Sequence, residues 1–447
     1  MIENAGRAEG AVIDGENVRK LIDNVVLRSD DMLMHADSAY QFIGRNLIHA
    51  FNIQIETEKE IVWADTLFHN TATEYSQFRG RVILETSENT VFSQQVDMYA
   101  PIDLALFLTP LRFEDAGGVL LAERGFYYQD IDSAGFYGNV QLADSTQYLE
   151  SDSLFMNRNK EIYELFGQVY ADDYEDKVTF AGEYLLADST GYRLLLGDDA
   201  WMMEVSESEA DTTHLLAKKI EVMESDTASY LDAYTDVRIW STKFAAIADT
   251  ANYRDDLDQF ILRSSPILWQ NNIQLTGPLI EAWFEDEDIT FLRSFIRPIA
   301  VQEDSVTGRL NQMTGDTLHA YFNEGDIERM VVFDNSEIIF HLKDDDDQPD
   351  GLIELIATGP STMWFADGDI DYFKAERDID GSNLPEDPAN IGRQLENFRW
   401  DPERKPERPP ILKPRLPEIP DERLFDWPER YLRYLENREQ VAEQEDD

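Results

Sequence analysis

A three-residue pattern returns along most of this chain about every 28 to 31 residues, and it constrains the fold more than any other feature. In most copies a small or polar residue comes first, then Asn, Asp, Gln or Arg, then a β-branched residue. A fixed period of this length is typical of repeat architectures in which neighbouring units stack. The copies are Asp23–Val25, Phe51–Ile53, Gly80–Val82, Gly138–Val140, Gly167–Val169 and Thr235–Val237.

A second signature follows each opening by about a dozen residues, and it places a small residue and an acid ahead of an aromatic. One aromatic per unit should stack in register along one face of the repeat. Two interpretations are open: ordinary core packing, or an incompletely closed core that leaves an apolar groove for acyl chains. The copies are Ala36–Tyr40, Ala64–Phe68, Ser151–Phe155 and Ala248–Tyr253, with only the aromatic end kept in Gly125–Tyr127 and Gly182–Tyr184.

Each repeat unit is predicted to contain two β-strands. Segments such as Leu47–Ile55 and Val62–Phe68 alternate apolar and polar residues and are rich in β-branched and aromatic side chains. Beyond residue 197 the period loosens, which indicates loop insertions in the same architecture. We therefore expect an all-β repeat body over residues 18–378, preceded by an N-terminal lead-in over residues 1–17.

The composition changes after about residue 378. Ten of the 17 prolines lie between Pro385 and Pro428. This favours a Pro-rich tail over residues 379–447, with extended, polyproline-like chain. Within it, residues 429–441 are predicted either to form a short amphipathic helix or to remain a partly ordered tail.

The chain carries 90 Asp or Glu against 38 Lys or Arg, a formal charge of −52. Such a surface repels nucleic acid and anionic lipid head groups unless cations screen it. Because the acids are spread through every unit, we interpret them as an acidic, halophilic adaptation, with specific metal binding as the alternative. The chain has no cysteine, which excludes disulfides and thiolate zinc sites.

Catalytic signatures are missing from the sequence. The six histidines are scattered without metal-binding spacing, and no nucleophile elbow, phosphate loop or dinucleotide fingerprint occurs. We therefore predict a non-enzymatic protein without a metal or other cofactor. No apolar run is long enough for a transmembrane helix, and the start lacks the features of a signal peptide. Either the chain is cytosolic, or a signal peptide has been removed.

The paired signatures, clearest over Asp23–Tyr40 and Gly138–Phe155, resemble the OstA-like family of lipopolysaccharide-transport proteins, which includes LptA, LptC and the N-terminal jellyroll of LptD. The resemblance extends in degraded form over roughly residues 18–375, and Leu395–Trp400 is similar to the end of large members. It implies an elongated, open, V-shaped β-jellyroll (a β-taco) with a hydrophobic slide for acyl chains. It also implies subunits joined edge to edge into a periplasmic bridge.

On this resemblance we expect a periplasmic bridge protein that binds lipopolysaccharide or another acylated glycolipid and serves outer-membrane assembly. Nucleic acid is not an expected partner. Two alternatives stay open: a β-solenoid polysaccharide lyase or hydrolase, and a purely structural, self-assembling repeat protein with a filled core. The groove candidates, expected to face inward, are Tyr40, Phe68, Phe155, Tyr184, Tyr253, Ala36, Ala64 and Ser151.

A sheet that does not close on itself leaves an unpaired first strand. We expect this edge strand near residues 18–27, where no proline blocks pairing. It should accept a strand from another jellyroll protein of the same pathway by β-augmentation. The candidate pairing residues are Val18, Leu21, Val25 and Leu27.

Overall fold

The structure is a computed structural model that describes residues 1–29, 32–206, 211–225, 228–285, 288–323, 325–366, 368–420 and 424–445. Contacts between residues divide the chain into two compact units. Unit 1 contains Met1–Glu175 together with Lys413–Asp447, and unit 2 contains Asp176–Leu412. Strands dominate both units, so the predicted all-β fold is confirmed.

Unit 1 is built from antiparallel strands, and most of its long strands pair with the next long strand along the chain. Short 3₁₀ turns, η1 (Ile43–Arg45), η2 (Ala100–Ile102) and η3 (Arg158–Lys160), connect some of them. The strands are β1 (Ile2–Asn4), β2 (Arg7–Ile13), β3 (Glu16–Arg28), β4 (Leu33–Phe42), β5 (Leu47–Glu56), β6 (Ile61–Asn70), β7 (Tyr75–Glu85), β8 (Asn89–Tyr99), β9 (Leu104–Phe107), β10 (Leu111–Asp115), β11 (Gly118–Ala122), β12 (Arg124–Tyr128), β13 (Ser133–Asp144), β14 (Gln147–Asn157) and β15 (Ile162–Asp173).

The long strands of unit 1 bend in the middle, at the repeated motifs. Between β3 and β4, Ile22 pairs with Ser38 and Val25 pairs with Ala36, so two residues face one across a β-bulge. The two bulged residues, Asp23 and Asn24, have φ of 63° and 49°. Asn, Asp and Gly adopt this left-handed backbone most readily, which explains the composition of the motif.

The bend divides unit 1 into two layers. One half of β8 pairs with β9, whereas its other half pairs with β10. Layer one therefore contains β2, β9, β12 and the neighbouring halves of the long strands. Layer two contains β1, β10, β11 and the remaining halves.

The core of unit 1 lies between the two layers, in rows that take one residue from each strand. These side chains are at most 7% exposed, and burial of apolar area is the main favourable contribution to folding. The row of layer one contains Leu21, Ala39, Ala50, Leu67, Phe78, Val96 and Phe107. The rows of layer two contain Val25, Ala36, Ile53, Ala64, Val82 and Ser93, and then Leu27, Met34, Ile55, Val62, Leu84 and Val91.

Unit 2 begins with long strands and continues with short ones. The long strands are β16 (Val178–Asp188), β17 (Tyr192–Val205), β18 (Thr212–Ser225), β19 (Ala228–Trp240) and β20 (Ala245–Arg254), and η4 (Asp255–Leu257) follows. The short strands are β21 (Gln259–Arg263), β22 (Ile267–Gln270), β23 (Ile273–Thr276), β24 (Leu279–Glu285), β25 (Asp288–Phe295), β26 (Ile299–Glu303), β27 (Leu310–Thr314), β28 (Thr317–Asn323), β29 (Asp326–Phe333), β30 (Ser336–Lys343), β31 (Pro349–Ala357), β32 (Ser361–Ala366), β33 (Asp369–Ala375) and β34 (Asp380–Leu384).

The short strands of unit 2 form two layers that both start from β20. Its C-terminal half pairs with β21, and β24, β25, β28, β29, β32 and β33 continue that layer. Its N-terminal half pairs with β22, and β23, β26, β27, β30, β31 and β34 form the other. Several of the corners between the layers contain two consecutive left-handed residues, as at Asp334 and Asn335. The repeat period loosens here because each bent strand has become two strands with a connecting corner.

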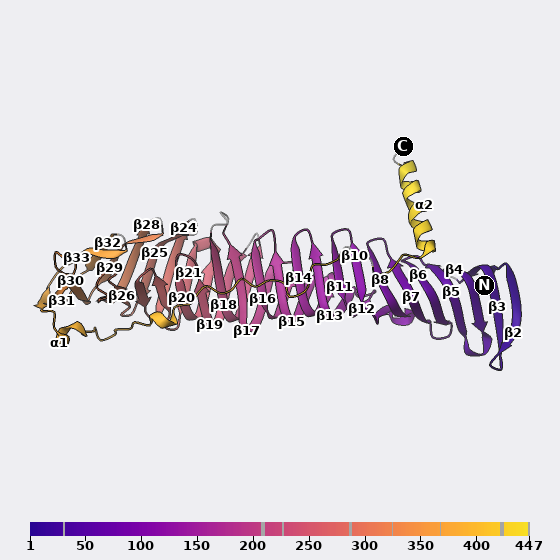
Figure 1. Ribbon diagram of the computed structural model, residues 1–447, viewed down its shortest axis with the longest axis horizontal. Helices are drawn as coiled ribbons and strands as arrows, with labels where there is room; N and C mark the ends of the chain where they lie inside the picture. Colours follow the sequence, from indigo (N-terminus) through magenta and orange to yellow (C-terminus); the bar gives the residue numbers. More distant parts are fainter. Residues whose placement is uncertain are drawn as a thin grey trace. The chain divides into compact units, whose positions relative to one another are not determined.

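The Pro-rich tail contains α1 (Pro388–Ile391), η5 (Pro402–Arg404) and α2 (Glu429–Glu445). The predicted helix over residues 429–441 therefore lies within α2. In unit 1 the start of α2 packs on the outer face of layer two, where Tyr431 lies 4.8 Å from Trp63 between ring centroids. Figure 1 shows α2 in yellow, beside β6.

The prediction that residues 18–27 form the edge strand is wrong. These residues lie in β3, which pairs with β4 on one side and with β1 and β2 on the other. Residues 1–17 lack the alternation of apolar and polar residues that indicates a strand. The tight turn at Asp14 and Gly15 nevertheless folds β2 back onto β3. Val18, Leu21, Val25 and Leu27 are therefore internal and buried.

Candidate functional site

The inner face of layer one is apolar in its buried row and mixes apolar and polar residues at the rim of unit 1. The rim row lies two residues beyond the buried row on each strand, and most of its side chains are half-buried. Between the bend and the rim, the inner face therefore changes from a filled core to a partly accessible surface that is only partly apolar. The half-buried rim residues include Ile48, His69, Ser76, Met98, Tyr127 and Met156.

Side chains from both layers meet at this rim. The guanidinium of Arg158, in η3, lies over the ring of Phe113 in layer two, 5.6 Å from its centroid. Glu60 precedes β6 in layer two, where burial raises its pKa to about 7; the nearby charge of Lys59 opposes the shift and that of Asp103, beyond η2, adds to it. The rim thus combines apolar rings with a cation and with a carboxyl group that titrates near neutral pH.

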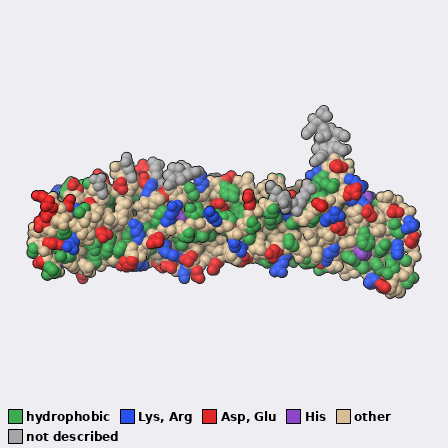
Figure 2. Space-filling model, in the orientation of Figure 1, with side chains coloured by type: hydrophobic (Ala, Val, Ile, Leu, Met, Phe, Trp, Pro, Cys, Tyr) green, Lys and Arg blue, Asp and Glu red, His purple; other side chains and the backbone are tan. Residues whose placement is uncertain are grey.

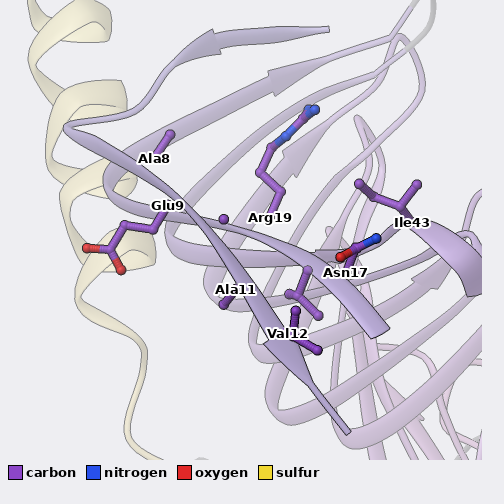
Figure 3. A pocket seen from close by; sticks show the side chains of 9 residues that line it. Ala8, Glu9, Ala11, Val12, Asn17, Arg19 and Ile43 are labelled. Carbon is purple, nitrogen blue, oxygen red and sulfur yellow. The ribbon is translucent and has the colours of Figure 1, made fainter. Parts of the chain in front are cut away.

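A concavity of about 440 Å³ lies at the N-terminal edge of unit 1 (Figure 3). It is formed by β2, β3 and η1. Val12 and Ile43 are 69% and 60% exposed there, and Arg19 adds a positive charge. Glu9 lines the same concavity, so the site offers one charge of each sign beside its apolar residues.

The predicted groove residues fall into different positions. Ala36, Ala64 and Ser151 are buried at the bend, at 0–2% exposure. Tyr253 is half-buried and lies two residues from the fully buried Ala251, on the inner face of unit 2.

The other predicted aromatics do not face inward as expected. Tyr40, Phe68, Phe155 and Tyr184 are half-buried and stand next to fully buried inner residues, so they lie on the outer face. Successive residues of a strand point to opposite faces, and the bulge at each bend reverses which of them point inward. The position of this reversal could not be predicted from the sequence. In unit 1 the rings form a ladder in which His49 stacks on Phe68 at 4.1 Å and Tyr40 meets Phe51 at 5.7 Å.

The acid of the second signature has a structural role that the sequence did not reveal. Its carboxylate accepts a hydrogen bond from the polar residue of the three-residue pattern that opens the next sequence repeat. Asp37 accepts from Asn52 at 2.8 Å, and Asp65 accepts from the Arg81 guanidinium at 2.7 Å. The same link joins Glu123 to Asn139 and Asp152 to Gln168. The two signatures therefore supply the two partners of one hydrogen bond between neighbouring sequence repeats.

Within the described residues, no group of three or more His, Asp or Glu side chains could hold a metal ion. No helix in the same part of the chain is long and apolar enough to cross a membrane.

Comparison with known proteins supports the resemblance over part of the chain. Residues 1–152 match the family model described as OstA-like protein, so the predicted resemblance is confirmed for this segment. It spans most of the strands of unit 1. A comparison with curated proteins found no match.

Among solved structures, one similar chain is LptH, described as the LptA-homologous periplasmic component of the lipopolysaccharide transport device from Pseudomonas aeruginosa. The alignment has 11% identity and covers 24% of this chain and 75% of that chain, with a TM-score of 0.22. A TM-score this low indicates neither fold nor function.

Proposed function

We propose that this chain is a non-enzymatic, periplasmic lipid-binding protein of lipopolysaccharide transport, and that it serves outer-membrane assembly. The OstA-like match over residues 1–152 supports the pathway. The apolar inner face of unit 1 supports the ligand class, an acylated glycolipid.

The observation that carries the proposal is the set of half-buried apolar residues at the rim of layer one. Ile48, Met98 and Met156 lie there, and Phe113 of layer two contacts Arg158 at the same rim. Each CH₂ group of an acyl chain that leaves water there contributes about 0.8 kcal/mol. Reversible binding therefore requires most of an acyl chain, about ten methylenes or more, in contact with several strands.

The polar end of the lipid would lie outside the apolar rows. Arg19 at the N-terminal concavity offers one cation for a phosphate or carboxylate group, with Glu9 beside it. The chain as a whole is strongly acidic, and Figure 2 shows Asp and Glu side chains interspersed with Lys and Arg over the visible face. We therefore expect divalent cations to bridge phosphorylated lipid to the protein.

Partners of the same pathway would pair with the strands at the N-terminal edge. β1 and β2 pair with β3 on one side, and most of their residues are exposed. An edge strand of this kind accepts another strand through main-chain hydrogen bonds. The edge-pairing proposal is thus transferred from β3 to β1 and β2.

One observation favours a second candidate, the structural repeat protein with a filled core. The inner row of layer one nearest the bend is fully buried, and Leu21, Ala39 and Ala50 are each 0% exposed. Lipid binding therefore requires the rim, whereas a purely structural role does not.

A photo-crosslinking experiment separates these candidates. A photoreactive amino acid at Met98 stands on the inner rim, and one at Tyr40 stands on the outer ladder. With lipopolysaccharide bound to the full chain, we expect several-fold more labelling at Met98. Equal labelling at both positions, or none, would refute a lipid site between the layers.

A further inference from the structure

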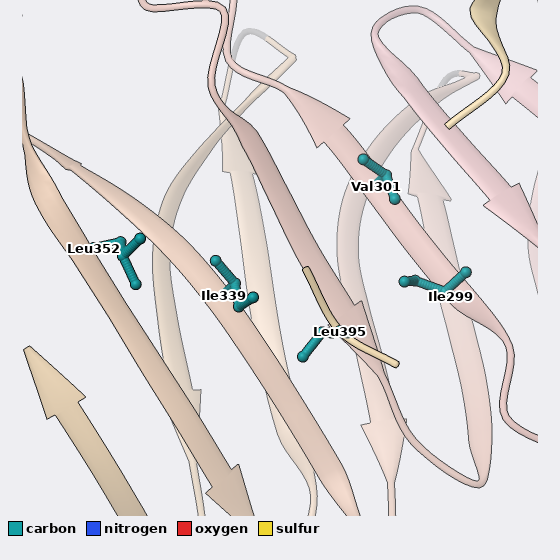
Figure 4. Close-up of a cluster of buried hydrophobic side chains, with 5 residues drawn as sticks. All are labelled: Ile299, Val301, Ile339, Leu352 and Leu395. Carbon is teal, nitrogen blue, oxygen red and sulfur yellow. The ribbon is translucent and has the colours of Figure 1, made fainter. Parts of the chain in front are cut away.

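The C-terminal tail lies on the outer face of layer two in unit 1 and of the layer that contains β22, β23, β26, β27, β30 and β31 in unit 2. In unit 2, Leu395 packs among Ile299, Val301, Ile339 and Leu352 (Figure 4). These four strand residues are 0–2% exposed with the tail in place. Phe398 and Trp400 extend the same contact. The tail therefore covers an apolar surface on the outside of the sheet.

Two buried glutamines bind the backbone of the tail in the same way. The amide of Gln312 donates to the Arg393 carbonyl at 3.1 Å and accepts from the Leu395 N–H at 2.9 Å. The amide of Gln274 donates to the Arg399 carbonyl at 3.0 Å and accepts from the Asp401 N–H at 2.8 Å. Each glutamine thus binds the C=O of one tail residue and the N–H two residues later.

These glutamines are only 1% and 0% exposed, and they lie on strands β27 and β23 with one strand between them. A polar side chain is rarely buried without a partner, because an unpaired amide costs free energy. Here the partners are main-chain atoms of the tail, along with Trp269, whose indole N–H donates to Gln274.

Unit 1 holds the next part of the tail by similar contacts. Glu150, 2% exposed, accepts from the backbone N–H groups of Arg415 and Leu416 at 2.6 and 2.9 Å. Gln141 donates to the Pro417 carbonyl at 2.8 Å. Binding through main-chain atoms depends little on side-chain identity and suits proline-containing chain, which cannot join a strand ladder.

Charge favours the same contact. Residues 393–415 contain seven Lys or Arg and four Asp or Glu, a net charge of +3, whereas the whole chain carries −52. Arg393 pairs with Glu354, and Arg415 lies 3.4 Å from Asp152. Arg408 lies over the ring of Trp240 at 5.3 Å.

We propose that the outer face of each unit binds an extended, proline-containing basic peptide, and that the tail is the resident ligand of both, with residues 393–412 in unit 2 and residues 413–417 in unit 1. Gln312 and Gln274 bind the peptide backbone, and the cluster around Leu395 provides an apolar anchor site. The site is separate from the interior proposed for lipid.

The first test uses hydrogen exchange in the full-length protein. Replacing both Gln274 and Gln312 by Leu keeps their volume and removes four hydrogen bonds to the tail. We expect exchange over residues 393–401 to rise by about tenfold or more, without a change in β17 or β18. The control is Gln54→Leu, whose amide bonds Glu56 rather than the tail. Unchanged exchange over residues 393–401 in the double variant would overturn the proposal.

The second test supplies the ligand in trans. In a full-length Leu395→Asp/Trp400→Asp variant the tail loses its anchor, while the strand residues stay intact. A fluorescent peptide with the sequence of residues 391–412 should bind this variant, as measured by anisotropy. Adding Gln274→Leu and Gln312→Leu should weaken that binding by about tenfold or more. Equal peptide binding with and without the two glutamines would contradict the proposal. So would the absence of peptide binding to the Leu395→Asp/Trp400→Asp variant, once hydrogen exchange shows that its own tail is released.

Discussion

At the scale of single residues, three copies of the repeat motif place a glycine directly against the acid of the previous repeat. Gly80 has φ of +94°, and a Cβ there would lie 2.4 Å from the Asp65 carboxylate. The same geometry recurs at Gly167, where a Cβ would lie 2.4 Å from Asp152. The small residue of the first signature is thus in steric contact with the acid of the second, in addition to the hydrogen bond between the two signatures.

This coupling predicts the cost of one added methyl group. Gly80→Ala should lower the free energy of unfolding by about 1–3 kcal/mol, because it forces a left-handed alanine against the acid of the previous unit. Gly10→Ala, in edge strand β2, is the control, since nothing lies within 4 Å of its Cβ. Urea unfolding measures both variants, and equal stability of the two would contradict this explanation of the motif.

Glu60 predicts a pH dependence at the rim of unit 1. Its pKa rises from 4.5 to about 7 on folding, chiefly through burial. The protonated form is therefore favoured by folding, and this contribution is lost as the pH rises through about 7. Glu60→Gln should raise stability at pH 8 by about 1–2 kcal/mol and have little effect at pH 4.5. The exposed Glu58→Gln is the control, and a Glu60→Gln gain that is equal at both pH values would be inconsistent with burial as the cause.

At the scale of elements, the first edge strand is β2. The two-residue turn at Asp14 and Gly15 makes Ile13 and Glu16 a hydrogen-bonded pair, so Ala8 falls at a position whose N–H points away from β3. Ala8→Pro should therefore block an incoming strand and leave the β2–β3 pairing intact.

Val25→Pro should instead destabilise the fold by about 3 kcal/mol or more, because β3 is internal.

Pull-down with jellyroll partners of the pathway, together with a melting curve, measures both effects. We expect Ala8→Pro to lose the partners at an unchanged melting temperature. Full partner binding by Ala8→Pro would show that association does not use this edge.

The start of α2 anchors the tail in unit 1. Tyr431 is 4% exposed and packs on Trp63, and Tyr434 donates to Glu85 at 3.1 Å. Tyr431→Ala should weaken this docking by about 3 kcal/mol and increase tryptic cleavage at Arg433. Leu432→Ala removes a side chain that is 41% exposed and should leave cleavage unchanged. Equal cleavage of the two variants would show that α2 is not anchored by its aromatic face.

Elements with strong local signals could be predicted from the sequence. Alternation located strands such as Leu47–Glu56, and the motif marked the bends. The inward side of each strand could not be predicted because the bulge at each bend changes the parity, as the outward position of Tyr40 shows. β1 and β2 were missed because edge strands are exposed on both faces and show little alternation. The tail contacts of Gln274 and Gln312 have no local signal, since they join residues more than 80 positions apart.

At the scale of the whole molecule, the charge of −52 predicts a strong effect of salt. The screening length falls from about 10 Å at 0.1 M to about 3 Å at 1 M ionic strength, so repulsion among the acids decreases. The melting temperature should rise with sodium chloride, with only a modest further gain from calcium. A melting temperature that stays constant between these concentrations would contradict charge repulsion as a limit on stability.

If lipid binds between the layers of unit 1, acylated glycolipid should co-purify with the protein from a Gram-negative periplasm, and mass spectrometry should detect it. Ile48→Asp places a charge on the inner rim, and Phe51→Asp places one on the outer ladder. We predict acylated glycolipid with the unaltered chain and with Phe51→Asp, and its loss with Ile48→Asp. Absence of lipid from the unaltered chain, or equal amounts with both variants, would contradict the claim.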